Sequence, residues 1–236
     1  MTDSQPESSA LPKFVQISEF LIREIASGRL IDGARLAPER DMAAELGVSV
    51  GTLRKSLKEL EKKGLLERVQ GSGNYIRHGP IEDSVYAMFR LELRAGGGLP
   101  RAEVIGVTRC IKPADLPGFG ASESATRIRR LRYLNDTLVA VEEIWLDGRA
   151  GVVTAEGLSE SLYHHYRTKL GLWISRMEDR VSVAPVPGWS PPAFPLAPGT
   201  TTGFIERFGW VDAAHPVEYS RTWFDTTRSV YVQRLK

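Results

Sequence analysis

The stretch that decides the fold runs over residues 38–76 and reads PERDMAAELGVSVGTLRKSLKELEKKGLLERVQGSGNYI. A helix is expected to begin near Pro38, because proline suits the first helical turn and the acidic residues after it favour a helix N-terminus. Gly47 ends this helix. Ser49 follows after one intervening residue and is a suitable N-cap for a second helix reaching about Lys63. A very short turn between two helices is therefore predicted.

The residues on either side of these two helices complete the pattern. LLERV and NYIRH flank residues 70–73, Gln-Gly-Ser-Gly, and predict two short strands around a tight turn. Upstream, Phe14, Ile17, Leu21 and Ile25 recur at three- and four-residue steps and predict a further helix that ends at Gly28. Helix, helix, short turn, helix and hairpin, in that order, predict a winged helix-turn-helix over residues 13–78.

The helix expected over 49–63 has an apolar side and a cationic side. At 100° per residue, Leu53, Leu57 and Leu60 fall within about 60° of one another and form the side that is buried. The opposite side carries Gly51, Lys55, Lys58 and Lys62, with Arg54 on its flank. A solvated surface is the ordinary interpretation of such charges. Because this helix follows a tight turn and precedes a Gly-x-Gly hairpin, contact with DNA is the favoured interpretation.

The sequence changes character after His78. Residues 79–84, GPIEDS, read as a linker, and residues 85–236 are mostly strand-like. RIRRLRYL and LVAVEEIWLD predict two strands joined by a turn at Asn135-Asp136, and SESLYHHYRTKLG predicts a short helix capped by Ser159 and ended by Gly171. The further strand candidates are VYAMFRLEL, WISRMEDRVSVAPV, GFIERFGWVD, VEYSRTWF and SVYVQRL. The fold class expected is α+β, with a mostly antiparallel sheet in the second domain.

Composition limits the setting in which the protein works. The chain has 236 residues, 42% of them hydrophobic and 25% charged, with a net charge of +2, which is ordinary for a globular protein. No run of eighteen apolar residues occurs, so no membrane span is expected. The polar residues 1–12 read as a disordered tail and not as a secretory signal. Cys110 is the single cysteine, which favours a reducing cytoplasm over a disulfide framework.

Two regions resemble known families. Residues 28–76 resemble the DNA-binding domain of the GntR family of bacterial repressors in the order and spacing of their elements and in the terminal Gly-x-Gly-x-aromatic wing. The C-terminal region resembles the UTRA effector domain, which defines the HutC subfamily and shares its fold with chorismate lyase. The segments that carry this second resemblance are RLRYLNDTLVAVEEIWL, LSESLY, IERFGW and PVEYSRTWF.

The GntR resemblance implies a DNA-binding set. Arginine can bind phosphate or guanine with two hydrogen bonds, and short hydroxyls in the first turn of a helix can reach phosphate. Glycines in the wing would let the backbone approach the minor groove. The implied residues are Arg40, Ser49, Thr52, Arg54, Lys55, Lys58, Gly71 and Gly73. A surface ion pair with Asp41 or Glu45 is the alternative for Arg40.

One departure from the family pattern concerns the start of the recognition helix. Most relatives carry arginine where this chain has Val50, followed by a polar or small residue where it has Gly51. Without that base-reading side chain, discrimination at one base pair falls by roughly 1–3 kcal/mol. A different operator preference is expected, while phosphate contacts still supply much of the affinity for DNA.

The UTRA resemblance implies an effector site around Arg130 and Arg132, which lie two residues apart on one strand and so share a face. Burying two guanidinium groups without partners would cost several kcal/mol each, so they need an anion. In UTRA domains this pair resembles the one that binds a phosphate or carboxylate. The other implied residues are Ser161, Glu218, Phe224, Glu142 and Tyr163. The alternative is a structural network in which Arg130 pairs with Glu142 or Glu218.

The proline-rich stretch 184–199, APVPGWSPPAFPLAPG, holds six prolines where relatives usually have a helix. Proline after proline cannot sustain a helix, so no effector-site residue is carried over from this region.

Together these features predict a cytoplasmic, homodimeric transcriptional regulator, nucleoid-associated when bound to DNA. It would bind a palindromic operator in double-stranded DNA, act as a repressor and respond to a small anionic metabolite. No catalytic residue or cofactor is expected, because the sequence has no recognisable nucleophile-base motif and no cofactor-binding loop. No metal ligand is expected either, since His164 and His165 are adjacent and point about 100° apart on a helix. A chorismate lyase-like enzyme fused to a DNA-binding module and an effector-independent DNA-binding protein are the alternatives.

Overall fold

The structure is a computed structural model that describes residues 12–26, 28–77, 88–156, 158, 161–211 and 215–233. The chain divides into two compact units, with sequence boundaries between Leu91 and Glu92 and between Val230 and Tyr231. The predicted linker and, apart from Pro12, the predicted tail lie outside the described residues. Within those residues, no helix has both the length and the apolar composition needed to cross a bilayer.

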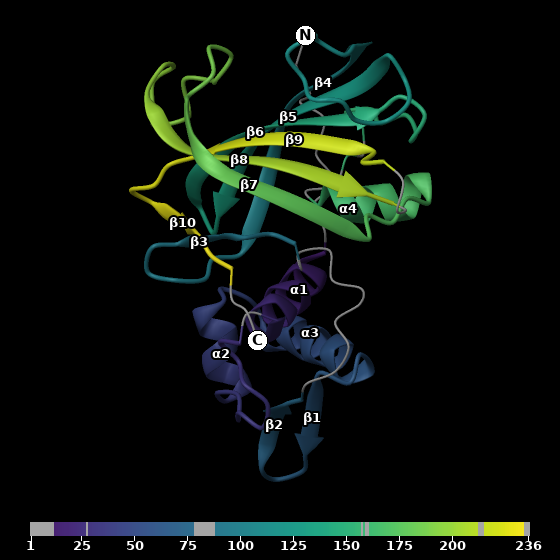
Figure 1. Ribbon diagram of the computed structural model, residues 1–236. Coiled ribbons are helices and arrows are strands. Elements are labelled where there is room, and N and C mark those ends of the chain that lie inside the picture. The colour runs from purple at the N-terminus through teal and green to yellow at the C-terminus, as the bar shows by residue number, and fades with distance from the viewer. Residues whose placement is uncertain are drawn as a thin grey trace, which may run out of the picture. The chain divides into compact units, whose positions relative to one another are not determined.

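The N-terminal unit contains the winged helix-turn-helix that the sequence predicts (Figure 1). Its elements are α1 (Lys13–Ala26), α2 (Glu39–Glu45), α3 (Val50–Lys62), β1 (Leu66–Val69) and β2 (Gly73–Ile76). Helix α1 packs against α3, and α2 also packs against α3.

Buried aliphatic side chains explain why these helices associate. In α3, Leu53, Leu57 and Leu60 are fully buried, as the helical spacing predicts. Gly47 sits between α2 and α3 with a φ of 62°, a left-handed conformation that a residue with a side chain adopts only at a cost. This glycine allows the very short turn that sets α3 against α2.

The wing is larger than the predicted hairpin. β1 and β2 pair antiparallel, with Leu66 opposite Ile76 and Val69 opposite Gly73. The segment before α2 lies beside β2, because Arg35 forms an isolated antiparallel β-bridge with Tyr75. This bridge was not predicted from the sequence.

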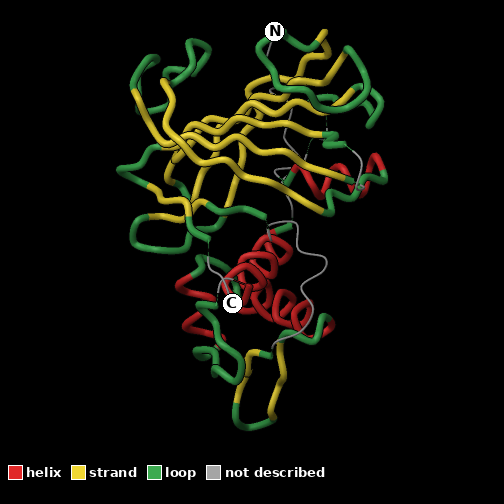
Figure 2. The backbone as a smooth tube through the Cα atoms, in the orientation of Figure 1, coloured by secondary structure: helices red, strands yellow, loops and turns green. Residues whose placement is uncertain are grey.

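The C-terminal unit is built on a six-stranded antiparallel sheet of order β4-β5-β6-β9-β8-β7, whose strands are labelled in Figure 1. Figure 2 draws these strands in yellow. Its strands are β4 (Pro100–Ile111), β5 (Ser124–Leu134), β6 (Thr137–Asp147), β7 (Arg176–Pro185), β8 (Thr201–Trp210) and β9 (Glu218–Phe224). A separate two-stranded sheet pairs β3 (Leu91–Leu93) with β10 (Ser229–Tyr231). The predicted α+β class is confirmed.

The strand predictions are correct for the central strands and wrong at two places. The turn at Asn135-Asp136 joins β5 to β6 as expected, with Asn135 at a φ of 55°. Strand β4 was missed, because its apolar residues do not alternate cleanly and a β-bulge interrupts it between Val104 and Gly106. The strand predicted over 85–93 is wrong in its described part, since Met88 lies in a turn and the strand begins only at Leu91; residues 85–87 lie outside the described residues.

The helix predicted from SESLYHHYRTKLG begins later than expected. Helix α4 spans Leu162–His165 and continues as a π-helical turn, η1 (Tyr166–Leu170), that ends at Gly171. Ser161 caps α4 by accepting a hydrogen bond from the His164 backbone N–H at 3.3 Å. The predicted cap at Ser159 is therefore corrected to Ser161; Ser159 itself lies outside the described part of the chain.

The two faces of the six-stranded sheet are covered differently. The face that we call the α4 face packs Ile128, Ile144 and Leu146 against Leu162 and Tyr166. The opposite face, which we call the loop face, carries the side chains of Trp145, Tyr219 and Trp223. Two segments without helices or strands, 112–122 and 186–199, supply side chains that pack on the loop face, among them Phe119 and Phe194. The proline-rich stretch therefore covers the loop face.

Candidate functional site

Helix α3 presents an exposed cationic surface. Its N-cap residue Ser49 accepts a hydrogen bond from the Thr52 backbone N–H at 3.1 Å, and the two hydroxyl oxygens lie 2.9 Å apart. The first contact gives a hydrogen-bond acceptor to a backbone N–H in the first turn of the helix, and together the two contacts hold both hydroxyl groups at the N-terminal end of α3. Lys55 and Lys58 are exposed on the side opposite the buried leucines. The surface fits the anionic backbone of nucleic acid.

Arg54 has a protein partner at the edge of this surface. Its Nε donates to Oε2 of Glu39 at 2.6 Å, although 64% of the Arg54 side chain is exposed. This hydrogen bond lowers the pKa of Glu39. Glu39 also accepts a hydrogen bond from the Asn74 side chain at 3.5 Å, so one carboxylate links α2, α3 and β2.

The remaining cations of the predicted DNA-binding set are not engaged by acids. Within the described residues, Arg40, Lys55 and Lys58 have no ion pair, so the alternative partners Asp41 and Glu45 do not hold Arg40. Exposed cations without acidic partners are available to phosphate at little desolvation cost.

Sequence reasoning missed two arginines beside the wing. A groove of ≈ 870 Å³ runs between the segment before α2 and the hairpin, and Arg35 and Arg68 line it. Arg68 lies 3.2 Å from Glu61 and donates from Nη2 to the Arg54 carbonyl oxygen at 3.3 Å. The signal that could have indicated these arginines is a basic residue in each of the two segments that line the groove, Arg35 before α2 and Arg68 in β1.

The two wing glycines differ in their surroundings. Gly71 has a φ of 75° and open space where a Cβ would lie. Gly73 has a φ of 131°, and a Cβ there would come within 3.1 Å of Arg35 Nε. Gly73 therefore also serves to fit Arg35 against the hairpin.

The predicted effector residues on the sheet lie together on the α4 face. Arg130 on β5 is in register with Glu142 on β6, and its Nη2 and Nε donate to Oε2 of Glu142 at 2.7 and 3.1 Å. Nε of Arg132 lies 3.9 Å from the same oxygen. Both guanidinium groups are buried. Burial raises the pKa of Glu142, but the two arginines outweigh that effect and hold the pKa below its usual value.

A second carboxyl, that of Glu218, lies in the same buried cluster. The Tyr163 hydroxyl donates to Oε1 of Glu218 at 2.9 Å, and Glu218 is only 1% exposed. Burial raises the pKa of Glu218 and raises the pKa of Tyr163 well above its usual value. Arg207 on β8 acts electrostatically on both Glu142 and Glu218.

Three residues of this cluster, Arg207, Asp179 and Tyr166, were not predicted from the sequence. Arg207 binds Asp179 with two hydrogen bonds, at 2.5 and 2.6 Å, across the pair β7 and β8. Tyr166 is fully buried and lies by Glu218. The IERFGW segment contains Arg207, so its two-residue alternation was the available signal for that residue.

The last two predicted effector residues border the cluster. Phe224 on β9 lies in register with Ala140, which is itself opposite Arg132. The Phe224 ring packs over Gly203, where a Cβ would lie 2.3 Å from Cζ. Ser161 is buried at the start of α4. The roles of all seven residues toward a ligand stay predictions, and Arg130 already has the carboxylate partner of the alternative interpretation.

Comparisons with known proteins agree with this arrangement. Residues 14–76 match the family described as bacterial regulatory proteins, gntR family, and residues 96–229 match the UTRA domain. The HTH-type transcriptional regulator SmoD of Agrobacterium fabrum is 56% identical over 228 residues, which cover 96% of this chain and 97% of SmoD. The HTH-type transcriptional repressor NagR of Bacillus subtilis is 24% identical, with 97% of each chain covered.

Solved structures show the same fold. The crystal structure of the possible transcriptional regulator YydK from Bacillus subtilis superposes with a TM-score of 0.53 at 23% identity, covering 96% of this chain and all of that one. The ligand-binding domain of a putative GntR-family regulator from Bordetella bronchiseptica superposes with a TM-score of 0.52 at 20% identity, covering 62% of this chain and 96% of that one.

Proposed function

Because this chain belongs to the gntR family of bacterial regulatory proteins and carries a UTRA domain, we propose that it is a homodimeric repressor released from a palindromic operator by a small anion. The chain is a DNA-binding transcriptional regulator with an effector domain, and it is not an enzyme. The dimer, the operator symmetry, the nature of the effector and the residues involved are the proposed parts.

The observation that carries the DNA-binding role is the cationic side of α3. Lys55 and Lys58 are exposed opposite the fully buried leucines, without ion pairs among the described residues. We propose that α3 enters the major groove, where Arg54 reaches base edges and Ser49 and Thr52 contact phosphate. Arg40 would contact the backbone, and the wing at Gly71 and Gly73 would approach the minor groove.

Val50 gives this regulator a different operator preference from relatives with arginine at that position. An aliphatic side chain cannot form two hydrogen bonds with guanine, so about 1–3 kcal/mol of discrimination at that base pair is lost. Contact with a thymine methyl group is available to Val50 instead.

The buried charges on the α4 face support an anionic effector. Arg130, Arg132 and Arg207 face the carboxyls of Glu142, Asp179 and Glu218, and the raised pKa of Glu218 favours its neutral form relative to an ordinary glutamic acid. An anion at Arg130 and Arg132 would compete with Glu142 for the same donors. To reduce operator occupancy tenfold, its binding needs a coupling free energy of about 1.4 kcal/mol.

Dimerisation through the C-terminal domain would pair two winged helices with the two halves of an operator. We propose that the effector changes the separation of these two DNA-binding domains. Since the target is DNA, the protein is proposed to act in the cytoplasm, at the nucleoid when bound.

The experiment that tests these proposals measures fluorescence anisotropy of the full chain with DNA fragments from around its own gene. Tight binding of an intact palindrome and weak binding of a single half-site are expected, with a molar mass of two chains by light scattering. Absence of binding to every fragment at low salt would contradict the operator proposal, and a monomer would contradict the dimer. A thermal-shift screen of anionic metabolites then identifies the effector, because a ligand of the native state raises the melting temperature.

A further inference from the structure

The loop face of the sheet contains a cavity of ≈ 290 Å³ that is separate from the predicted effector site. Its floor is formed by side chains of β5, β6 and β9, and the segments 112–122 and 186–199 supply its walls through Asp115 and Trp189. Adjacent residues of a strand point to opposite faces of a sheet. Arg129 therefore lines this cavity, whereas its neighbour Arg130 lies on the α4 face.

Three indole rings line this cavity. Trp145, Trp189 and Trp223 all line it, and the rings of Trp189 and Trp223 meet edge to face with centroids 5.8 Å apart. The Arg129 guanidinium lies 4.4 Å from the centroid of the Trp189 ring. Trp145 and Trp223 are buried and Trp189 is half-buried, so Trp189 is the ring of the three on which a ring-shaped molecule could stack.

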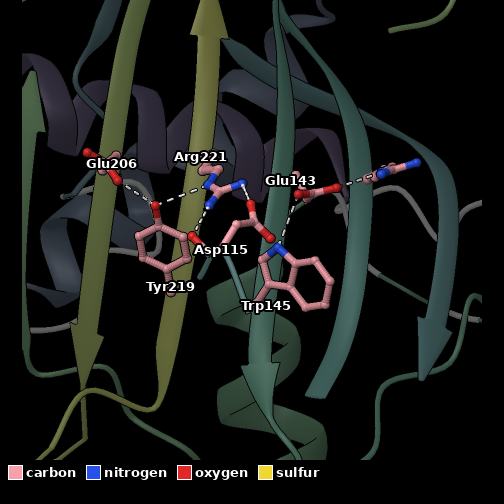
Figure 3. Close-up of polar contacts among 7 residues, drawn as sticks. Asp115, Glu143, Trp145, Glu206, Tyr219 and Arg221 are labelled. Carbon is pink, nitrogen blue, oxygen red and sulfur yellow. Dashed lines mark hydrogen bonds and ion pairs between the residues drawn. The ribbon is translucent and has the colours of Figure 1, made fainter. Parts of the chain in front are cut away.

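Two of the three arginines in the cavity are held by protein groups, and Figure 3 labels one of them, Arg221, beside Asp115 and Tyr219. Nε of Arg129 donates to Glu143 at 2.8 Å, and Glu143 also accepts from the Trp145 indole N–H at 3.2 Å. Nη1 of Arg221 donates to Oδ2 of Asp115 at 3.0 Å, and its Nε donates to the Tyr219 hydroxyl at 3.1 Å. These contacts fix the positions of both guanidinium groups.

The third arginine, Arg127, is different. Within the described residues it has no hydrogen bond or ion pair, and its guanidinium lies 5.7 Å from the centroid of the Trp145 ring. The side chain is half-buried. The charged groups that line the cavity are Arg127, Arg129, Arg221, Asp115 and Glu143, so the positive charges exceed the negative charges by one.

We propose that this cavity is a second small-molecule site and that it binds a ring compound with one negative charge, such as a small aromatic carboxylate. The ring would lie against Trp189, which is half-buried, and the carboxylate would pair with Arg127. The volume suits a single-ring molecule. Segment 186–199 contributes Pro187 and Trp189 to the walls, so the proline-rich stretch builds this site. This cavity lies on the opposite face of the sheet from the effector site proposed at Arg130 and Arg132.

The test uses the full chain labelled with 5-fluorotryptophan and read by fluorine NMR, with benzoate as the probe. The chain has five tryptophans, and single Trp→Phe variants assign their signals. Benzoate is expected to shift the signals of Trp145, Trp189 and Trp223 saturably, and to leave those of Trp173 and Trp210 unchanged. Benzamide, which keeps the ring but has no charge, and acetate, which has the charge but no ring, are expected to bind at least tenfold more weakly.

Variants separate the two sites. Arg127→Gln and Trp189→Ala are each expected to weaken benzoate binding at least tenfold, whereas Arg127→Lys retains part of it. Arg132→Gln, on the α4 face, is the matched control and is expected to leave benzoate binding unchanged. No saturable shift with benzoate, undiminished binding in Arg127→Gln, or loss of binding in Arg132→Gln would each overturn the proposal. Operator binding, measured on the same samples, reports separately on the regulator function.

Discussion

Nε of Arg54 donates a 2.6 Å hydrogen bond to Oε2 of Glu39, which joins the recognition helix α3 to the first residue of α2. Both side chains are partly exposed, so solvent screens the pair and it contributes little to stability. Its effect is on geometry, because it orients a long side chain that would otherwise sample many rotamers. A DNA phosphate or guanine that approaches Arg54 meets a guanidinium that is already positioned.

Replacing Arg54 with alanine is expected to weaken operator binding by about 1–3 kcal/mol and to relax base specificity at the operator position that Arg54 reads. The melting temperature should stay unchanged, since the pair with Glu39 is screened. Arg180→Ala is the control, because Arg180 is 63% exposed and is also paired with a glutamate, Glu178, on the effector domain. If operator affinity falls equally in both variants, Arg54 has no special role at the operator.

Arg132→Ala is expected to abolish release from the operator by the anion that the thermal-shift screen identifies, while DNA binding without effector persists. The reason is that Arg132 is buried beside Glu142, on the face where the anion would bind. Anisotropy titrations with and without the anion measure both quantities. Arg127→Gln, on the same strand but the opposite face, should respond normally. An undiminished response in Arg132→Ala places the effector site elsewhere.

Glu218→Gln is expected to stabilise the protein increasingly as pH rises. Burial raises the pKa of Glu218 in the folded state, above its unfolded value of about 4.3. As pH rises above the unfolded value, the unfolded state loses its proton first, so the wild type loses stability until the folded pKa is passed. Glutamine does not titrate and can still accept the Tyr163 hydrogen bond. Melting temperatures of both proteins between pH 4 and 8 test this, and a difference that shrinks as pH rises would contradict it.

Gly203→Ala is expected to cost about 1–3 kcal/mol of stability. A Cβ at Gly203 would lie 2.3 Å from the buried Phe224 ring, which must then shift. Gly106→Ala is the matched control, since Gly106 also lies in a strand and nothing occupies the space within 4 Å of a Cβ there. Urea denaturation measures both variants. The double variant Gly203→Ala with Phe224→Leu should recover stability relative to Gly203→Ala alone, and equal costs for the two alanines would show that the ring contact is unimportant.

Much of the DNA-binding domain could be predicted from the sequence. The caps, the glycines and the leucine spacing that define α2, α3 and the wing lie within a single stretch, and each acts over a few residues. The shared face of Arg130 and Arg132 was equally accessible, because side chains alternate along a strand. What sequence reasoning missed in this domain, such as the β-bridge from Arg35 to Tyr75, depends on chain segments forty residues apart.

In the effector domain the sequence by itself determined which residues form the central strands and which of their side chains share a face. The tertiary structure alone decided the strand order, the edge strand β4, the pairing of Tyr163 with Glu218, and the position of the proline-rich stretch on the loop face. The physical reason is the distance along the chain over which each kind of interaction acts. Capping, turn conformation and alternation are set by neighbouring residues, whereas buried ion pairs and loop packing depend on which distant strands the whole sheet brings together.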